Sequence, residues 1–348
     1  MTETRSFLPR EKSQAPYFVG VDLGGTGVKI GVVDDLGRPM SWLSVPTNVE
    51  DGPEDAMRRT GTAVHQAIAQ AGLKAADIAR LGLGSPGTMD IPAGLLLQPP
   101  NLVGWENFPI RSRLEQHSGF APIAFANDAN AAAYGEFWVG SGRELQSMVL
   151  FTLGTGVGGG IIIGDLVVDG HHSTGGECGH IIIDMEPDAR LCTCGKTGHL
   201  EAYCSATSVV KRTQELLTGT TRPTSLRRRI EQGDELTTLM LAEEAEAGDA
   251  FSHEIIVATA RYFGVGVTTL MHVIDPEGVV IGGAMTFGGH DSPVGRKFLE
   301  ELRAEVRRRA FPVPAEKTVI DYAQLGGDAG FIGAAGVARL EHRRAKLK

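Results

Sequence analysis

An aspartate stands at the point where a predicted strand becomes a predicted helix. Residues Ile123 to Ala126 are typical of a short buried strand, and Asp128 to Val139 of an alanine-rich helix that ends at Gly140. Asp128 could cap this helix, because Asp is a good N-cap residue, or it could accept a proton in a reaction. A cap would not require Asn127 beside it or a strand directly in front. The helix dipole would keep the carboxylate ionised, so both interpretations of Asp128 are open from these residues alone.

Two glycine-rich turns between predicted strands could bind phosphate groups. The first is Asp22-Leu23-Gly24-Gly25-Thr26, and the second is Gly154-Thr155-Gly156-Val157-Gly158-Gly159-Gly160. Such turns can present backbone N–H groups and threonine hydroxyls to a triphosphate. Each could instead be a tight hairpin without a ligand, but the occurrence of two similar turns favours phosphate binding.

The second turn also has the spacing of the dinucleotide-binding pattern, Gly154-x-Gly156-x-x-Gly159. That pattern should open a helix, because the pyrophosphate lies at the helix N-terminus. Three consecutive β-branched residues, Ile161 to Ile163, predict a strand instead. No Gly-Lys-Ser or Gly-Lys-Thr follows this turn directly, so a Walker-type loop is excluded as well. An NAD-dependent enzyme is therefore disfavoured.

The elements that must position these residues are typical of an α/β protein with an internal duplication. The pattern of strand, glycine-rich turn, strand and turn occurs twice, which predicts two lobes of similar topology rather than a solenoid. Predicted strands lie at 17–21, 28–33, 78–83, 123–126, 148–153, 161–163 and 278–281. Predicted helices lie at 54–71, 111–116, 128–139, 201–217, 237–247, 251–272 and 331–340.

The composition is that of an ordinary globular protein. The chain has 348 residues, 42% of them hydrophobic and 22% charged, which suits one large or two medium domains. A net charge of −9 argues against a nucleic-acid partner, which needs a basic face. No apolar run approaches the roughly 18 residues that span a membrane, and Met1 to Pro16 is expected to be a frayed leader. Four cysteines in so long a chain favour a reducing cytoplasm over a disulfide scaffold.

The motif Asp22-x-Gly24-Gly25-Thr26-x-x-Lys29 resembles the first phosphate motif of the ROK family of sugar kinases and repressors, within the actin/hexokinase-like ATPases. Residues 152–160 resemble its second phosphate motif, and Val279 to Met285 its adenosine motif. The resemblance implies that ATP, with Mg²⁺, is the phosphoryl donor. The implied nucleotide-binding residues are Asp22, Gly24, Gly25, Thr26, Lys29, Gly154, Thr155, Gly156, Gly282 and Gly283.

The resemblance extends from about Tyr17 to about Ala338 and implies two lobes of duplicated actin/ribonuclease-H-like topology, with a cleft between them. The small N-terminal lobe would span residues 17–124 and be completed by a C-terminal helix over 331–348. The large lobe would span residues 125–330 and carry a metal-binding loop.

The same resemblance assigns roles to polar residues along the chain. Asp128 would accept the proton of the attacking sugar hydroxyl, and phosphoryl transfer needs such a base mainly to orient the nucleophile. Sugars are recognised by buried hydrogen-bonding groups that a missing hydroxyl would leave unpaired. The implied sugar-binding residues are Gly87, Asn101, Asn127, Glu177, His180 and Glu201.

A zinc site is also implied, although this sequence departs from the family there. The family has Cys-x-Cys-Gly and a third cysteine, and this chain has His199 at the third position. The expected ligands are His180, Cys192, Cys194 and His199. Zinc accepts two cysteines and two histidines as readily as three cysteines and one histidine. The alternative is that His199 is a polar loop residue and that the metal is weakly bound or absent.

Three functions are considered for a chain with these motifs. A hexose kinase is favoured, with glucose as the leading substrate because residues 99–107 look most like the glucokinases. N-acetylmannosamine, N-acetylglucosamine or fructose is the alternative, and polyphosphate could replace ATP. A sugar-responsive repressor is less favoured, because only about 16 residues precede the first predicted strand, too few for a DNA-binding domain. The expected partners are a sugar and ATP, with no nucleic acid and no membrane, in a homodimer or higher homo-oligomer.

Overall fold

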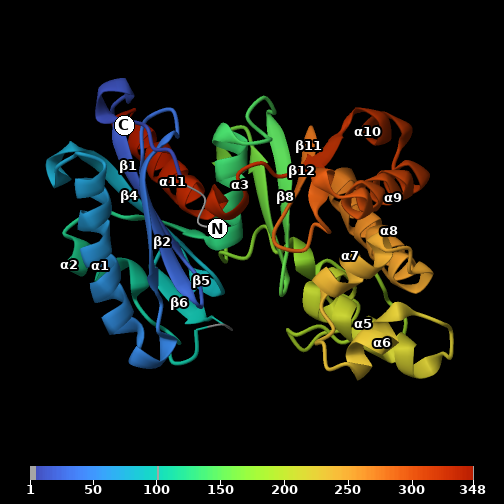
Figure 1. The fold of residues 1–348 in the computed structure, drawn as a ribbon. Coiled ribbons are helices and arrows are strands. Elements are labelled where there is room, and N and C mark those ends of the chain that lie inside the picture. Colours follow the sequence, from blue (N-terminus) through green and yellow to red (C-terminus); the bar gives the residue numbers. More distant parts are fainter. Residues whose placement is uncertain (1–4, 100–101, 348) are drawn as a thin grey trace. The chain divides into compact units, whose positions relative to one another are not determined.

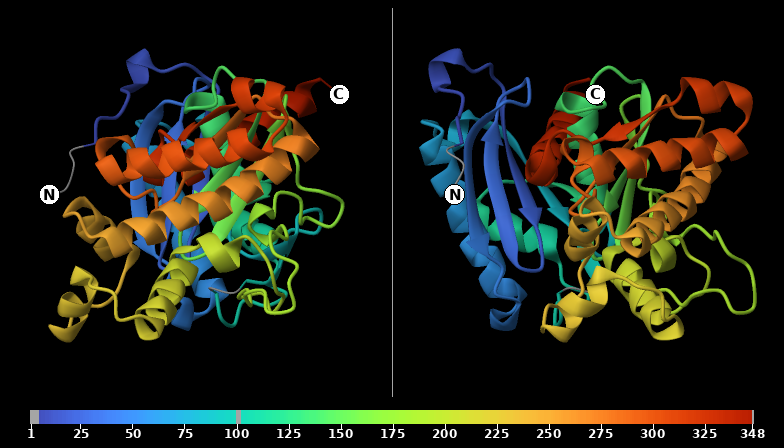
Figure 2. Two further views of the ribbon diagram at one scale, coloured as in Figure 1. Left: turned by 90° about the vertical axis from the view of Figure 1, so that its right-hand side faces the viewer. Right: turned by 45° about the vertical axis from the view of Figure 1, so that its right-hand side comes forward.

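Two compact units make up the chain. A computed structural model describes residues 5–99 and 102–347 (Figures 1 and 2). The first unit comprises Met1–Glu144, Gly160–Gly176 and Leu325–Lys348, and the second comprises Leu145–Gly159 and Glu177–Gln324. The helix that begins at Asp128 belongs to the first unit, whereas the resemblance implied a boundary that puts it in the large lobe. The reason is that it packs closely against the C-terminal helix.

A five-stranded sheet forms the centre of the first unit. Its strands are β1 (Tyr17–Leu23), β2 (Gly27–Val33), β3 (Pro39–Pro46), β4 (Ile78–Ser85) and β7 (Ala124–Asn127), in the order β3-β2-β1-β4-β7. The strand β2 runs antiparallel to β1 and β3, whereas β1, β4 and β7 are parallel to one another. The strands β1 and β2 are buried along nearly their whole length, as expected where both faces of a sheet are covered.

Helices cover both faces of this sheet. The helix α1 (Pro53–Gln70) packs on β2 and β3, and α2 (Ile110–Ser118) packs on α1. On the opposite face, α11 (Ala329–Lys346) lies across β1 and β4 and packs against α3 (Asp128–Val139), as Figures 1 and 2 show. A small hairpin of β5 (Thr88–Asp90) and β6 (Leu95–Gln98) completes the unit.

The contact between α11 and its neighbours depends on glycine. A Cβ atom at Gly20 of β1 would lie 1.8 Å from the carbonyl oxygen of Phe331, and one at Gly333 would lie 1.6 Å from that of Ala131 in α3. Protein interiors are packed to crystal density, so these positions cannot accept a larger side chain without moving the backbone. The helix α11 is therefore held directly against the strand and the helix that carry Asp22 and Asp128.

A second five-stranded sheet repeats the topology of the first. Its strands are β8 (Ser147–Leu153), β9 (Val157–Ile163), β10 (Leu166–Val167), β11 (Gly278–Gly282) and β12 (Val319–Tyr322), in the order β10-β9-β8-β11-β12. The strand β11 is parallel to β8 and β12. The first strand pair of each sheet is joined by one of the two glycine-rich turns, which confirms the predicted α/β fold and its internal duplication.

The helices of the second unit surround an aromatic core. They are α4 (Glu201–Cys204), α5 (Ala206–Gly219), α6 (Ser225–Glu231), α7 (Thr238–Glu246), α8 (Ala250–Ile274), α9 (Pro293–Arg309) and α10 (Pro312–Lys317). Phe263 of α8 contacts Phe151 of β8 edge-to-face and Phe298 of α9 in a stacked arrangement. The helix α8 is long and apolar enough to cross a membrane. However, 61% of its apolar stretch is buried within the protein, as in a core helix.

Two local expectations from the sequence are wrong. The single helix predicted at 201–217 is broken at Ser205, whose side chain accepts a hydrogen bond from the amide of Ser208 and caps α5. The segment up to Pro16 is not frayed over its described residues. The amide of Leu8 donates to the carbonyl of Pro39, and that of Asp35 donates to the carbonyl of Gln14. This segment therefore pairs with the ends of β2 and β3.

Candidate functional site

The first glycine-rich turn begins at a partly buried carboxylate. Asp22 lies near the end of β1, directly across from Lys29 of β2. Burial raises the pKa of Asp22, and the positive charge of Lys29 acts in the opposite direction. The Lys29 ammonium donates to the carbonyl of Gly327 at 2.8 Å, and a Cβ at Gly330 would lie 2.4 Å from the Asp22 carboxylate. The start of α11 therefore packs against this carboxylate, which the sequence alone did not predict.

A buried threonine holds the first turn in place. The turn is closed by the Gly24 amide, which donates to the Gly27 carbonyl at 2.9 Å. The hydroxyl of Thr47 donates to the Gly24 carbonyl at 2.6 Å, and its amide donates to the Thr26 carbonyl at 3.1 Å. Thr47 is completely buried, so its hydrogen bonds are made away from competing water.

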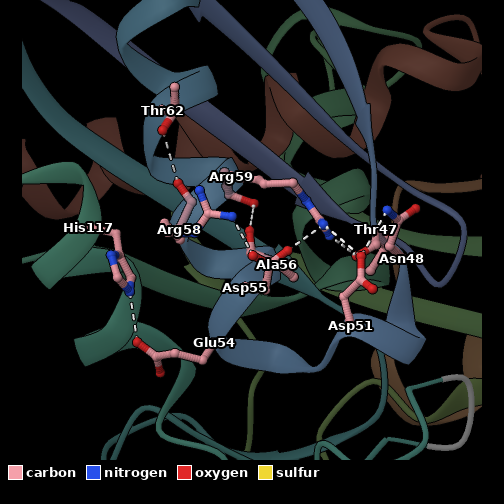
Figure 3. A network of polar contacts seen from close by, with 11 residues as sticks. Thr47, Asn48, Asp51, Glu54, Asp55, Ala56, Arg58, Arg59, Thr62 and His117 are labelled. Carbon is pink, nitrogen blue, oxygen red and sulfur yellow. Dashed lines mark hydrogen bonds and ion pairs between the residues drawn. The ribbon is translucent and has the colours of Figure 1, made fainter.

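A network of polar contacts supports Thr47 from α1 (Figure 3). The Arg59 guanidinium donates to the Thr47 carbonyl at 2.6 Å and forms ion pairs with Asp51 and Asp55. Arg58 also forms an ion pair with Asp55. Arginine suits this role because its planar fork of donors can bind a carbonyl and carboxylates at once. The position of the turn thus depends on residues that the sequence analysis did not single out.

Asp128 lies at the same edge of the first sheet as Asp22. Asp22 pairs with Gly84 of β4, and Gly84 pairs with Ala126 of β7, two residues before Asp128. A Cβ at Gly84 would lie 3.8 Å from the Asp128 Cα. Open α/β sheets bind their ligands at the carboxyl ends of parallel strands. The two carboxylates therefore lie at the edge of the sheet where a ligand is expected.

Asn127 rather than Asp128 is the N-cap of α3. The Asn127 side-chain oxygen accepts hydrogen bonds from the amides of Ala129 at 2.9 Å and Asn130 at 3.3 Å. Asp128 is the first helical residue, and it also accepts a hydrogen bond from the Ala129 amide at 2.9 Å. Its carboxylate is placed at the positive end of the helix, where negative charge is favoured.

Asn130, in the first turn of α3, holds the loop of the first unit that carries Asp169. Its side-chain amide donates to the carboxylate of Asp169 at 3.0 Å, and Asn130 itself is buried. Burial raises the pKa of Asp169, and the hydrogen bond from Asn130 has the opposite effect. Nothing in the local sequence around Asp169 indicated this pairing, because the two residues lie 39 positions apart.

Gly87 and Asn101 belong to the predicted sugar-binding set of the first unit. Gly87 has a φ of 92° between β4 and β5, a backbone conformation that other residues rarely adopt. It follows Ser85, which pairs with Asn127 across the sheet. Gly87 thus lies near the edge that carries Asp128, whereas Asn101 lies outside the described residues.

The second glycine-rich turn is held from one side by the start of α5. The Gly154 amide donates to the Gly156 carbonyl at 3.0 Å, which closes the turn as in the first unit. The Ala206 amide donates to the Gly154 carbonyl at 2.8 Å, and the Thr207 hydroxyl donates to the Thr155 carbonyl at 3.0 Å. The adenosine motif adjoins this turn, because the Met285 amide donates to the carbonyl of Leu153.

Glycines 154, 156 and 283 have different surroundings. A Cβ at Gly154 would have no heavy atom within 4 Å, whereas one at Gly156 would lie 2.6 Å from the carboxylate of Glu201. Gly283 has a φ of 91°, and a Cβ there would lie 2.2 Å from the Leu153 carbonyl oxygen. Of these three glycines, Gly154 is the one that presents open space where a phosphate group could approach.

The four predicted metal ligands converge in the second unit. One ligand atom from each of His180, Cys192, Cys194 and His199 lies within 4.8 Å of all the others. The Cys192 sulfur is 3.8 Å from His180 Nδ1, and the Cys194 sulfur is 3.2 Å from His199 Nδ1. Sulfur and nitrogen ligands of one tetrahedral zinc ion lie about 3.5 Å apart. These residues therefore fit a zinc ion.

The electrostatics differ between the ligands, because burial opposes the thiolate form of Cys192 and favours the neutral imidazole of His199. Burial raises the pKa of Cys192 to about 12, so its thiol must lose a proton to bind a metal ion. Burial lowers the pKa of His199, and nearby His180 lowers it further, which favours the neutral imidazole that metals require. All four cysteines of the chain are free, and Cys204 is buried against the carbonyl of Thr259.

The predicted sugar ligands of the second unit lie around this cluster. His180 Nδ1 faces Cys192, while His180 Nε2 lies 3.9 Å from a carboxylate oxygen of Glu177. Glu201 is buried, with 8% of its surface exposed, and follows His199 by two residues. One imidazole can thus bind a metal ion through one nitrogen and reach toward Glu177 through the other.

Comparison with known proteins adds independent information. The model of the ROK family matches residues 18–341. A glucokinase from Halalkalibacterium halodurans is 33% identical over 317 residues, which is 91% of this chain and 93% of that protein. The ROK hexokinase structure from Thermus thermophilus is 33% identical, with a TM-score of 0.79 and coverage of 94% of this chain and 99% of that one.

A second solved structure carries ligands. It is a ROK family glucokinase from Streptomyces griseus in complex with glucose and AMPPNP. It is 31% identical to this chain, with a TM-score of 0.70, and the alignment covers 93% of this chain and 99% of that one.

Proposed function

The chain belongs to the ROK family, and from that premise we propose that it is an ATP-dependent hexose kinase that phosphorylates the 6-hydroxyl of glucose. The observation that carries the proposal is the edge of the first sheet. There Asp128 begins α3 directly after Asn127, and the first glycine-rich turn follows Asp22 of β1 in the same sheet. A base and a phosphate-binding turn at one sheet edge are what phosphoryl transfer requires.

In this proposal Asp128 orients the sugar hydroxyl and accepts its proton as the bond to phosphorus forms. Asn127, Gly87, Asn101, Glu177, His180 and Glu201 would bind the other hydroxyls. Hydrogen bonds of this kind discriminate strongly, because a sugar that lacks one hydroxyl leaves a buried partner unsatisfied.

The two glycine-rich turns and Lys29 would bind the nucleotide phosphates, and Gly282 and Gly283 would lie along the adenosine. Mg²⁺ is usually bound through one or two carboxylates and the substrate phosphates. The partly buried Asp22 carboxylate, beside Lys29 and the first turn, fits that pattern. The metal would neutralise charge on the transferred group.

A zinc ion would be held by His180, Cys192, Cys194 and His199 and would order the loop between them. The observations that support it are the convergence of four ligand atoms and the S–N distances of 3.8 and 3.2 Å. With Nδ1 of His180 committed to the metal, Nε2 would be available to the sugar.

The choice of glucose rests on the names of the similar proteins, a glucokinase and a glucokinase complex with glucose and AMPPNP. N-acetylmannosamine, N-acetylglucosamine or fructose is the alternative substrate. We also propose that the protein acts in the cytoplasm as a homodimer or higher homo-oligomer.

The test is an assay of ADP release from ATP with each of these hexoses. In a parallel set polyphosphate replaces ATP, and the hexose phosphate formed is measured instead, because that reaction releases no ADP. The proposal expects glucose to give the highest kcat/KM with ATP. If another hexose is phosphorylated and glucose is not, that hexose is the substrate. If none of these hexoses is phosphorylated, the proposed kinase function is wrong.

A further inference from the structure

The carboxylate of Glu201 has one oxygen committed to the second glycine-rich turn. The amide of Val157 donates a hydrogen bond to Glu201 Oε2 at 3.0 Å. The same oxygen lies where a side chain on Gly156 would otherwise project. Together with the bonds that Ala206 and Thr207 make to this turn, the Glu201 bond fixes its backbone from the side of α4 and α5.

The other oxygen of Glu201 accepts hydrogen bonds from the metal-binding loop, which is the segment 192–199 that carries three of the predicted zinc ligands. Glu201 Oε1 accepts a hydrogen bond from the Thr193 hydroxyl at 2.5 Å and one from the Cys192 thiol at 3.3 Å. Thr193 lies between the two cysteines of the predicted zinc site, and it is exposed. The Thr193 hydroxyl is the closer of these two donors to Glu201 Oε1.

We propose that Glu201 is a positioning residue for the nucleotide, which links Thr193 of the metal-binding loop to the Val157 amide of the second glycine-rich turn. This rests on the proposed function, because it takes that turn to bind nucleotide phosphates. A sugar ligand alone would not need both oxygens engaged by the protein. The carboxylate spans two segments that lie 36 residues apart in sequence, so order in one is transmitted to the other.

Glu201 can position the turn because hydrogen bonds to a carboxylate are strong and directional. A hydrogen bond to a charged group contributes more than one between neutral groups, and inside a protein its loss is not fully replaced by water. Without the Thr193 hydroxyl, the Glu201 carboxylate can rotate away from Val157. The turn then loses its preorganised backbone, and nucleotide binding must supply that order.

The experiment compares Thr193→Val, which removes the hydroxyl, with Thr193→Ser, which retains it. Thr218→Val is the matched control, because Thr218 is an exposed threonine of α5 that bonds to the carbonyl of Gln214. Three quantities are measured: the Kd of a non-hydrolysable ATP analogue without sugar, hydrogen exchange at the Val157 amide, and bound metal.

We expect Thr193→Val to raise the Kd about fivefold and to speed exchange at Val157, with metal content unchanged. Thr193→Ser and Thr218→Val should stay within about twofold of the parent protein. Since Thr193 is exposed, all three proteins should fold. A Thr193→Val protein with parental Kd and parental exchange at Val157 would overturn the proposal. The proposal would also be overturned if exchange at Val157 in Thr193→Val rose only in proportion to the metal lost. In that case the metal, rather than the Thr193 hydroxyl, would position Glu201.

These outcomes separate the inference from the function on which it rests. If the parent protein binds no ATP analogue, the proposed function fails. Exchange at Val157 would in that case still show whether Thr193 and Glu201 position the turn.

Discussion

The side chain of Asn127 caps α3, which relieves its neighbour Asp128 of that role. The Asn127 oxygen accepts from two amides of the first helical turn, while Asp128 follows as the first residue of the helix. The sequence left two interpretations of Asp128 open, a helix cap or a base. The structure assigns the cap to Asn127, so the two functions can be separated by mutation.

Asp128→Asn should lower kcat by about 10²- to 10⁴-fold, because the side chain would no longer accept a proton. Glucose affinity should change by less than about tenfold, or about 1.4 kcal/mol. Steady-state kinetics and sugar titration would measure both. The control is Asn127→Ala, which should cost about 1 kcal/mol of unfolding free energy through the lost cap. Near-normal turnover in Asp128→Asn would contradict the assignment of the base.

Gly154→Ala should raise the KM for ATP about tenfold without lowering the melting temperature. The added methyl meets no protein atom within 4 Å, so it would interfere only with a ligand that approaches the turn. Gly156→Val is a less specific test, because a side chain there would collide with Glu201. ATP kinetics and thermal unfolding would be compared for both variants. Unchanged ATP kinetics in Gly154→Ala would argue against phosphate binding at this turn.

The metal site can be tested at its unusual position. His199→Cys should retain about one metal ion per chain and remain active, because it restores three cysteines and one histidine. His199→Ala should lose metal and sugar affinity in parallel, since the loop that carries Glu201 would lose order. Elemental analysis after chelator washing, beside sugar titration, gives the result. Fully active parent protein with no stoichiometric metal would refute the site.

Asp22→Asn should raise the melting temperature at neutral pH while it impairs catalysis. Burial raises the pKa of Asp22 in the folded protein, so the folded chain holds that proton more tightly than the unfolded chain. Stability from this group is therefore present below the unfolded value of about 3.9 and is lost as pH rises through the folded pKa. Asparagine cannot ionise, so the increase in melting temperature over the parent protein should be larger at pH 7 than at pH 4.

Thermal unfolding across this pH range would check the prediction for Asp22. The control is Asp188→Asn, which makes the same change at an exposed aspartate of the second unit. A gain of equal size at pH 4 and pH 7 would mean that side-chain size, rather than charge, is responsible.

Sequence reasoning succeeded where the signal was local. The turn after Asp22 and the helix that starts at Asp128 were predicted from glycine, β-branched and capping residues within a few positions. The four candidate metal ligands were expected from a resemblance alone; the structure brings their side chains together, and metal binding stays a prediction.

The residues that hold these turns in place by hydrogen bonds could not be predicted, because they lie far from the turns in the sequence. Thr47 bonds to Gly24 across 23 positions, and Glu201 bonds to Val157 across 44. A threonine after a strand or a glutamate at the start of a short helix has no local pattern that reveals its partner. The pairing of the segment before Pro16 with β2 and β3 was missed for the same reason. Its composition resembles a disordered leader, and only the sheet beside it provides partners.

The dependence of the first sheet on α11 sets an order of events during synthesis. One face of β1 and β4 packs on α11, whose glycine-mediated contacts with β1 and α3 leave no room for a substitute. Ribosomes add about 5–20 residues per second, so roughly 10–40 s separate the completion of α3 from that of α11. Throughout that interval an apolar sheet face is exposed to chaperones and to other nascent chains. The sheet edge that carries Asp22 and Asp128 is therefore completed only when translation has passed Lys346.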